Sequence, residues 1–248
     1  MRLTSLALSA LAIFFISASG QAETIVVGIE DKDYAPYYVW VEGEPQGPCP
    51  VIAAGAIRKM GAELEFVRLP WVRVLKSVES KRVDAGLCGT KTDERAAYSH
   101  YPEEPLLSFD ATLFVRSDSP LVSSDISGLT GKSFGLIKGY NYGGIDDDLE
   151  ASGMTRIEAN NRERLLKMLG IGRIDTLLDS TLPVLADAKE MGIVGEVRSL
   201  PPSLAETPGY LFFSRKPGHD ELTERFSAAL REFKTTEEYL AIKERYGL

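Results

Sequence analysis

The chain has 248 residues, of which 44% are hydrophobic and 26% charged, and its formal net charge is −8 at pH 7. A nucleic-acid-binding protein needs a basic footprint, so this acidic balance argues against a nucleic-acid partner. The length allows one large domain or two lobes of roughly 100 residues each. The only histidines, His100 and His219, and two cysteines do not make a ligand set, so we expect neither a metal nor a cofactor.

Residues 1–22 have the pattern of a secretory signal peptide. Arg2 supplies the positive start, and Leu6–Ile16 form an apolar stretch that is too short for a comfortable membrane span. Small residues precede an expected cleavage after Ala22. The sequence therefore predicts an exported, periplasmic and soluble protein.

Strands and helices alternate in the first part of the remaining chain. Ile25–Ile29 is a continuous apolar run, typical of a strand that is buried on both faces of a parallel sheet. The further predicted elements are a helix at 51–60 ended by Gly61, a strand at 64–69, a helix at 72–80 after Pro70-Trp71, and a strand from Val83. This order implies a parallel sheet with right-handed crossovers.

The segment Val83–Arg95 carries the clearest local functional signal. An apolar strand ends at a Gly-Thr turn, and Thr92 is placed as the N-cap of a helix with Asp93 and Glu94 in its first turn. Free N–H groups at a helix start favour an anion, and the planar guanidinium of Arg95 can bind a carboxylate through two hydrogen bonds. Taken locally, the segment indicates either a carboxylate pocket or an ordinary surface loop.

Two cysteines, Cys49 and Cys88, would face an oxidising compartment after export. Each follows a predicted strand and precedes a helix, so both could lie at the same edge of one sheet. The sequence does not decide whether these two cysteines form a disulfide bridge or remain two buried thiols.

A second series of strands and helices follows and has a similar plan. The predicted strands are Thr112–Arg116, Ser133–Ile137 before the loop Gly139–Gly144, Ile174–Leu178 and Tyr210–Ser214. The predicted helices are one capped by Asn161 and ending at Leu169, Leu182–Met191, Glu221–Phe233, and a last one from about Thr236. For the last helix the pattern predicts a capping box formed by Thr235 and Glu238. Two lobes of similar organisation are therefore expected.

Several short motifs occur together in a characteristic order. They are Tyr34-Ala-Pro36-Tyr37, Gly47, Pro70-Trp71-Val72-Arg73, Lys81-Arg82-Val83-Asp84-Ala85, Thr90-Lys91-Thr92-Asp93-Glu94-Arg95, Gly131-Lys132-Ser133-Phe134-Gly135, Gly172-Arg173-Ile174-Asp175, and Glu238-Tyr239-Leu240 with Tyr246-Gly247. In their order and spacing they resemble extracellular solute-binding proteins of the amino-acid-binding type, the soluble receptors of ABC importers. The resemblance covers nearly the whole chain after residue 22.

The resemblance implies an α/β, two-lobe periplasmic-binding-protein fold. Each lobe would be a mostly parallel sheet flanked by helices, with two hinge crossings near Asp110–Leu113 and Thr207–Tyr210. Lobe one would comprise residues 23–111 and 209–248, and lobe two residues 112–208. The expected partners are a small amino-acid-like ligand, whose binding closes the hinge, and a membrane permease of an ABC importer. The protein itself is expected to be a monomer.

The same resemblance implies roles for individual residues. Arg95 matches the family arginine that binds the ligand α-carboxylate, and Thr90 matches the hydroxyl residue beside it. Backbone groups of Cys88 and Thr90 would supply further donors. Tyr34 and Trp71 fall where aromatic side chains wall the pocket for the ligand side chain.

Some positions depart from the family pattern. Tyr140 and Asn141 stand at a lobe-two helix start where the family usually has a threonine that also holds the carboxylate. Asp179 and Ser180 compete for the place of the acid that pairs with the ligand ammonium, and Asp179 comes one residue early. A one-residue slip on a strand turns a side chain to the other face. A buried ammonium without a carboxylate is costly, which favours Asp179.

The predicted function is solute binding without catalysis. Two alternatives remain open on the same fold. One is a cyclohexadienyl-type dehydratase in which a cleft carboxylate acts as general acid, the candidates being Glu42, Glu44, Glu103 and Asp179. The other is a ligand sensor or adaptor whose closed form docks on a membrane partner without transport.

Overall fold

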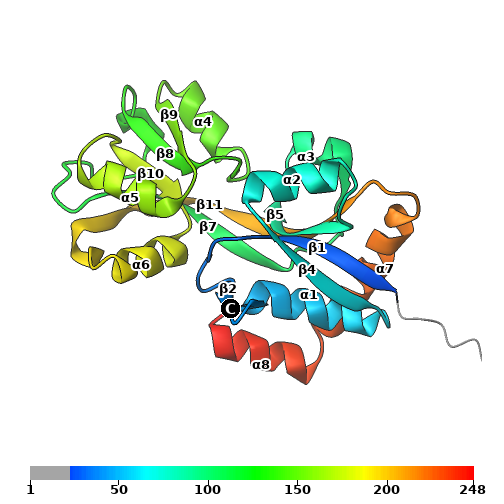
Figure 1. Ribbon diagram of the computed structural model, residues 1–248. Coiled ribbons are helices and arrows are strands. Elements are labelled where there is room, and N and C mark those ends of the chain that lie inside the picture. The colour runs from blue at the N-terminus through cyan, green and yellow to red at the C-terminus, as the bar shows by residue number, and fades with distance from the viewer. Residues whose placement is uncertain (1–22) are drawn as a thin grey trace, which may run out of the picture.

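The computed structural model describes residues 23–248, so the predicted signal peptide and its cleavage after Ala22 lie outside the described residues. Two α/β lobes share one nine-stranded sheet (Figure 1). Parallel strands form the outer part of the sheet in each lobe, and two long strands cross between the lobes. The predicted two-lobe α/β fold is confirmed. No helix within residues 23–248 is long and apolar enough to cross a membrane.

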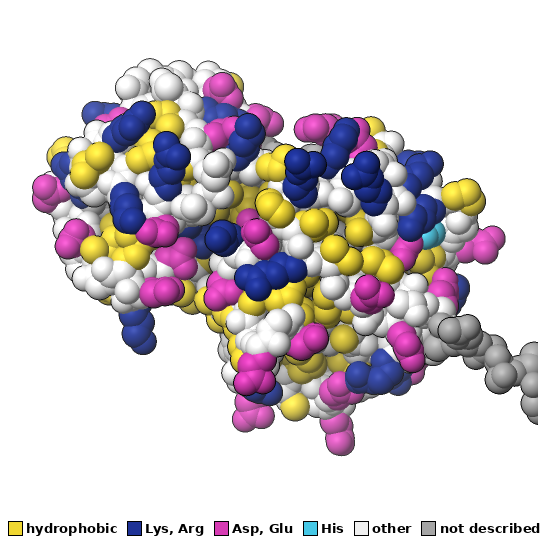
Figure 2. Space-filling model, viewed as in Figure 1, with side chains coloured by type: hydrophobic (Ala, Val, Ile, Leu, Met, Phe, Trp, Pro, Cys, Tyr) yellow, Lys and Arg dark blue, Asp and Glu magenta, His cyan; other side chains and the backbone are white. Residues whose placement is uncertain are grey.

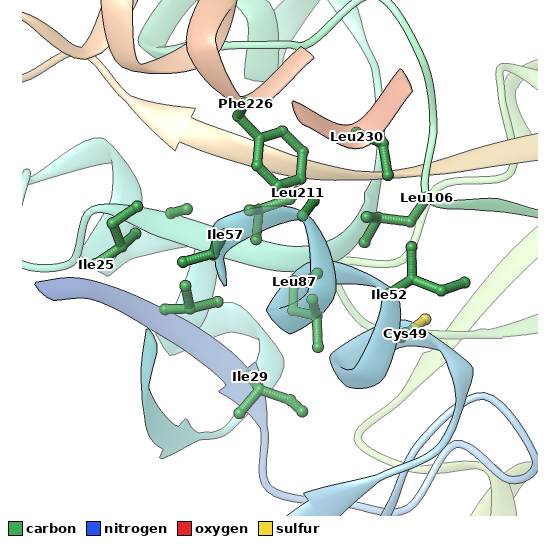
Figure 3. Packing of buried hydrophobic residues seen from close by; sticks show 14 of the residues in the cluster. Ile25, Ile29, Cys49, Ile52, Ile57, Leu87, Leu106, Leu211, Phe226 and Leu230 are labelled. Atoms are coloured by element: carbon green, nitrogen blue, oxygen red, sulfur yellow. The ribbon is translucent and has the colours of Figure 1, made fainter. Parts of the chain in front are cut away.

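The first lobe is built on the sheet order β4-β1-β5. These strands are Glu63–Leu69, Thr24–Glu30 and Ala85–Thr90, and both neighbouring pairs are parallel. The helices are α1 (Pro48–Lys59), α2 (Trp71–Glu79), α3 (Asp93–Tyr98), α7 (His219–Phe233) and α8 (Glu237–Tyr246). Helices α1 and α7 pack against the sheet, where Ile52, Leu211 and Phe226 belong to one buried cluster (Figure 3).

The second lobe repeats this organisation with the sheet order β10-β8-β9. Its strands are Thr176–Asp179, Ser133–Ile137 and Thr155–Ala159, again all parallel. Its helices are α4 (Ile145–Ala151), α5 (Arg162–Gly170) and α6 (Thr181–Glu190), with short 3₁₀ turns at Ile126–Gly128 and Val194–Glu196. As predicted, Asn161 caps α5, its side chain accepting a hydrogen bond from the backbone N–H of Arg164.

The lobes are joined by β7 (Leu107–Arg116) and β11 (Val197–Ser214), which pair antiparallel. One end of this ribbon pairs with β5 and the short β6 (Ser99–His100), and the other end pairs with β10. Both strands are longer than the sequence predicted, because Pro201-Pro202 and exposed polar residues hide the strand pattern in β11. The lobe boundaries at 111/112 and 208/209 stay predictions, since both strands continue through them.

Several local predictions are corrected. Helix α1 starts at Pro48 and not at Val51, because proline fits the first turn of a helix. The tyrosine-rich loop that starts at residue 33, here called the aromatic loop, leads into a two-stranded hairpin of β2 (Val39–Val41) with β3 (Glu44–Gln46). Strand β9 was not predicted, and α4 was expected only as a helix start at Tyr140 and Asn141, whereas it begins at Ile145.

The predicted capping box of the last helix is wrong. Thr236, and not Thr235, caps α8, because its hydroxyl accepts a hydrogen bond from the backbone N–H of Tyr239. The carboxylate of Glu238 pairs instead with Arg58 of α1 at 2.6 Å.

Candidate functional site

A cavity of about 40 Å³ lies between the lobes. It opens where β1, β5, β8 and β10 end, which is where open α/β sheets bind their ligands. Outside it, the junction of the lobes carries both basic and acidic side chains (Figure 2). The residues that line the cavity are Tyr34, Tyr38, Trp71, Cys88, Thr90, Arg95, Phe109, Tyr140, Asn141, Tyr142, Ser180 and Thr207.

Arg95 projects from α3 into the space between the lobes. The N-cap prediction for Thr92 is confirmed, because its hydroxyl accepts a hydrogen bond from the Arg95 backbone N–H. Arg95 is 5% exposed, and its guanidinium Nη1 donates to the carbonyl and the hydroxyl oxygen of Thr90, both at 2.8 Å. Its Nη2 donates to the Gly139 carbonyl of the other lobe, also at 2.8 Å. Burial lowers the pKa of Arg95, while nearby tyrosines and acids oppose that shift.

Thr90 and Trp71 extend this contact between the lobes. The Thr90 hydroxyl donates to the Asn141 carbonyl at 2.9 Å, and Trp71 Nε1 donates to the Gly139 carbonyl at 2.8 Å. The Trp71 ring lies 5.7 Å from the Arg95 guanidinium carbon. Phe212 packs edge-on against Trp71 and lies over β5, where a Cβ at Gly86 would come within 2.3 Å of its ring. The first lobe thus presents a fixed cation beside a fixed aromatic ring.

Tyr140 enters the cleft from the second lobe. Its ring meets Tyr34 and Trp71 edge-on, with a 6.0 Å centroid separation in each case. Its hydroxyl donates to Glu30 at 2.5 Å, and the Tyr38 hydroxyl donates to the same carboxylate oxygen at 2.9 Å. Glu30 is buried behind these rings, and burial raises its pKa in spite of both hydrogen bonds.

Asp179 and Ser180 point in different directions at the end of β10. Asp179 is fully buried and does not line the cavity; it accepts a 2.8 Å hydrogen bond from Arg162 Nε and another from the Ser180 N–H. Ser180 lines the cavity, accepting from the Tyr34 hydroxyl at 2.9 Å and donating to the Asp110 carbonyl at 2.8 Å. The period of two along a strand accounts for this division.

Arg162, at the start of α5, is the partner that the sequence did not reveal. It is 3% exposed, and its Nη1 also donates to Asp187 at 3.0 Å. Burial opposes the charge on this guanidinium, but the Asp179 carboxylate outweighs burial and leaves the pKa of Arg162 raised. Asp179 therefore already has a buried cationic partner within the protein.

A disulfide bridge joins Cys49 and Cys88. The sequence left open a disulfide bridge or two buried thiols, and the structure contains the bridge. It ties the first turn of α1 to β5 at the edge of the cavity. Cys88 has a φ of 56°, so the strand bends there toward the Thr90 turn.

The structure brings together eight of the nine predicted ligand-contacting residues around the cavity; Asp179 lies outside it. The lining residues that sequence reasoning missed are Tyr38, Phe109, Tyr142 and Thr207. Tyr38 and Tyr142 belong to the aromatic and Gly139–Gly144 loops, whose composition was a usable signal. Phe109 and Thr207 belong to the crossing strands and carried none, because an apolar or hydroxyl side chain in a strand looks like ordinary packing.

Solved structures of similar shape are ligand-binding and sensory proteins. An ancestral arginine-binding protein bound to arginine superposes with a TM-score of 0.75 at 22% identity, covering 90% of this chain and 97% of its own. A histidine kinase sensor domain with similarity to periplasmic binding proteins superposes with a TM-score of 0.76 at 23% identity, covering 91% of this chain and 96% of its own. An ancestral amino-acid-binding protein, a precursor of cyclohexadienyl dehydratase, superposes with a TM-score of 0.72 at 18% identity, covering 90% of this chain and 94% of its own. At these identities the similarity shows a common fold.

A comparison with curated protein sequences finds no match. The family of bacterial extracellular solute-binding proteins, family 3, matches residues 25–248. Because this match spans nearly every described residue, the chain belongs to the bacterial extracellular solute-binding proteins, family 3.

Proposed function

We propose that the protein captures a small carboxylate-bearing solute of the amino-acid type in the interlobe cavity and delivers it to the permease of an ABC importer. The observation that carries this proposal is the buried Arg95 guanidinium, whose Nη2 reaches across the cleft beside the Thr90 hydroxyl. Planar guanidinium groups bind carboxylates through two parallel hydrogen bonds. A carboxylate that took the place of the Gly139 carbonyl would satisfy the same donor.

The size of the cavity supports binding by hinge motion. The space open to the centres of water-sized spheres is only about 40 Å³, which is little room for the heavy atoms of an amino acid. Entry therefore requires the lobes to separate and to break the Arg95, Trp71 and Thr90 contacts with the second lobe. A ligand that replaces these contacts on closing shifts the balance between open and closed forms.

The proposed contacts follow the lining of the cavity. Arg95 and Thr90 would hold the carboxylate together with the backbone at Cys88, and Asn141 and Ser180 would face it from the second lobe. The rings of Tyr34, Trp71 and Tyr140 would enclose the body of the ligand. Asp179 would support the site from behind Ser180.

The remaining parts of the proposal concern the whole molecule. After removal of residues 1–22 the protein would work in the periplasm as a monomer, with lobes at 23–111 plus 209–248 and at 112–208. The membership in a family of extracellular proteins supports this location.

We propose binding without catalysis. Within residues 23–248 none of the four candidate acids lines the cavity. Glu42 and Glu44 are exposed on the β2–β3 hairpin, Glu103 is exposed and pairs with Arg231, and Asp179 pairs with Arg162. A general acid must lie within hydrogen-bond reach of its substrate. The similarity to a sensor domain makes a sensory role without transport the second candidate.

A thermal-shift screen of the protein comprising residues 23–248 tests the proposal. Amino acids, their 2-oxo and simple carboxylic counterparts, polyamines and sugars would be compared at equal concentration. Stabilisation by carboxylate compounds alone is expected. Stabilisation only by polyamines or sugars would refute the carboxylate site, and conversion of prephenate or arogenate to an aromatic product would refute the absence of catalysis.

A further inference from the structure

Among residues 23–248, the lining of the cavity carries a single formal charge, the guanidinium of Arg95. The other eleven lining residues are aromatic, hydroxyl-bearing, amide or disulfide groups. An α-amino acid with an uncharged side chain brings a carboxylate and an ammonium group, and the ammonium also needs a partner when it is buried. A ligand whose only charged group is a carboxylate matches this lining better than a zwitterion does, because Arg95 supplies the one opposite charge.

The place expected to hold an ammonium group offers only a hydroxyl. Ser180 Oγ already donates to the Asp110 carbonyl and accepts from the Tyr34 hydroxyl. An ammonium group has three N–H donors and no acceptor. The Ser180 hydroxyl could take one of them and would bring no opposing charge.

The carboxylates nearest to this place are already engaged with groups of the protein. Asp179 is bonded to Arg162 Nε and to the Ser180 N–H. Glu30 accepts two tyrosine hydroxyls, and Asp110 accepts the N–H and hydroxyl of Thr181. A ligand cation would have to share one of these carboxylates with the partners that it already has.

The guanidinium of Arg162 lies behind the same wall of the cavity. Its central carbon lies 5.0 Å from the centroid of the Tyr34 ring, which lines the cavity. This guanidinium pairs with Asp179 and Asp187, so it compensates the charge of Asp179 within the protein and not in the cavity.

An unpartnered donor lies on the second-lobe side of the cavity. The Tyr142 side chain is 3% exposed and lines the cavity, and within residues 23–248 its hydroxyl has no hydrogen-bond partner. Burial raises the pKa of Tyr142 well above its usual range, and the nearby Asp179 carboxylate adds to this shift through its charge and a hydrogen-bond contribution, so the hydroxyl keeps its proton. Since this contact with Asp179 does not reach ordinary hydrogen-bond geometry, the hydroxyl can donate to a better-placed acceptor. A carbonyl or hydroxyl oxygen of a ligand would supply one.

We infer that the cavity selects a small carboxylic acid with an aromatic or branched apolar body and no α-ammonium group, with a 2-oxo acid fitting best. Its carboxylate binds Arg95 and Thr90, its body lies among the rings of Tyr34 and Trp71, and its 2-oxo oxygen accepts from the Tyr142 hydroxyl. This inference rests on the proposed function and specifies the class of solute.

Matched compounds on one carbon skeleton test the inference directly. The protein comprising residues 23–248 would be titrated calorimetrically at pH 7 with phenylalanine, 3-phenylpropionate and phenylpyruvate, and with leucine, 4-methylpentanoate and 4-methyl-2-oxopentanoate. In at least one series the compounds without an ammonium group should bind at least tenfold more tightly than the amino acid. If some of these carboxylates bind and neither series shows this tenfold preference, the inference is overturned and the proposed function stays intact. Failure of every carboxylate to bind would refute the proposed function, and the inference with it.

The variant Ser180→Asp tests the same idea from the protein side. It places a carboxylate at the lining position where Ser180 now offers a hydroxyl, and it should shift the preference at least tenfold toward the amino acid. Ser199→Asp, the same change at an exposed position outside the lining, should leave the preference unchanged. An unchanged preference in a folded Ser180→Asp variant would contradict the inference. If that variant does not fold, the titrations of the unmodified protein decide.

Discussion

Arg95 of the first lobe donates a hydrogen bond from Nη2 to the carbonyl of Gly139 in the second lobe, 2.8 Å away. Trp71 Nε1 donates to the same carbonyl oxygen. One backbone oxygen of the second lobe thus accepts from two buried side chains of the first. A carboxylate has the acceptor capacity to take over both donors, so under the proposed function a ligand would replace the Gly139 carbonyl at this contact.

The first prediction concerns the guanidinium fork. Arg95→Lys keeps the charge but loses the planar pair of donors, so the affinity for a stabilising carboxylate should fall about 10- to 100-fold, as expected for a charge-assisted hydrogen bond of about 1.5–3 kcal/mol. Isothermal titration would measure this loss. Arg73→Lys, on an exposed position of α2, is the matched control and should bind normally. Equal affinities in the two variants would remove Arg95 from the site.

The second prediction concerns the buried carboxyl of Glu30. Burial raises its pKa in the folded protein above the ordinary value of 4.5, so its contribution to stability is complete below pH 4.5 and is lost as the pH rises through the folded pKa. Glu30→Gln retains an acceptor oxygen for the two tyrosine hydroxyls, both of which bond one Glu30 oxygen.

Urea unfolding between pH 4 and pH 8 would measure this effect. The free energy of unfolding of Glu30→Gln should decline less with rising pH than that of the unmodified protein. Glu63→Gln, at an exposed position of β4, should follow the unmodified protein. Parallel pH profiles for all three proteins would show that Glu30 does not titrate in this range.

The third prediction concerns the buried ion pair of Arg162 and Asp179. Removing one partner from a buried pair costs about 3–5 kcal/mol, because the other charge stays uncompensated. Arg162→Met and Asp179→Asn should each lower the free energy of unfolding by about this amount. The double variant should lose less free energy of unfolding than the two single variants lose together, and the difference should be a coupling energy of about 0.5–3 kcal/mol. Strict additivity in urea unfolding would contradict direct pairing.

The fourth prediction concerns the Cys49–Cys88 bridge, which closes a loop with a sequence separation of 39. In the chain-entropy account such a bridge stabilises a protein by about 4 kcal/mol. Replacing both cysteines by alanine should lower the free energy of unfolding by about that amount, and adding a reductant should lower the Tm of the unmodified protein. The double variant serves as the control, because a reductant should leave its Tm unchanged.

Much of the fold followed from local patterns in the sequence. The apolar run that became β1, the Thr92 and Asn161 caps, and the alternation of strands with helices all depend on neighbours within a few residues. Such short-range preferences act in every part of the chain and can be recognised without coordinates. The position of Arg95 beside Thr90 follows from the same kind of pattern, helped by the resemblance to a known family.

Other features were decided only by long-range packing. Strand β11 continues past the irregularity at residues 201–204 because the residues on both sides of it pair with β7, and this pairing brings Phe109 and Thr207 to the cavity. The choice between Asp179 and Ser180 depended on where β10 ends and on Arg162, 17 residues earlier in the chain. Sequence alone determined most of the helices and strands, because they follow from local spacing, and the family resemblance added Arg95 as the cation expected to face the cleft. Tertiary structure decided which carboxylates remain free to meet a ligand, because a buried charge is neutralised by whichever partner the fold brings beside it.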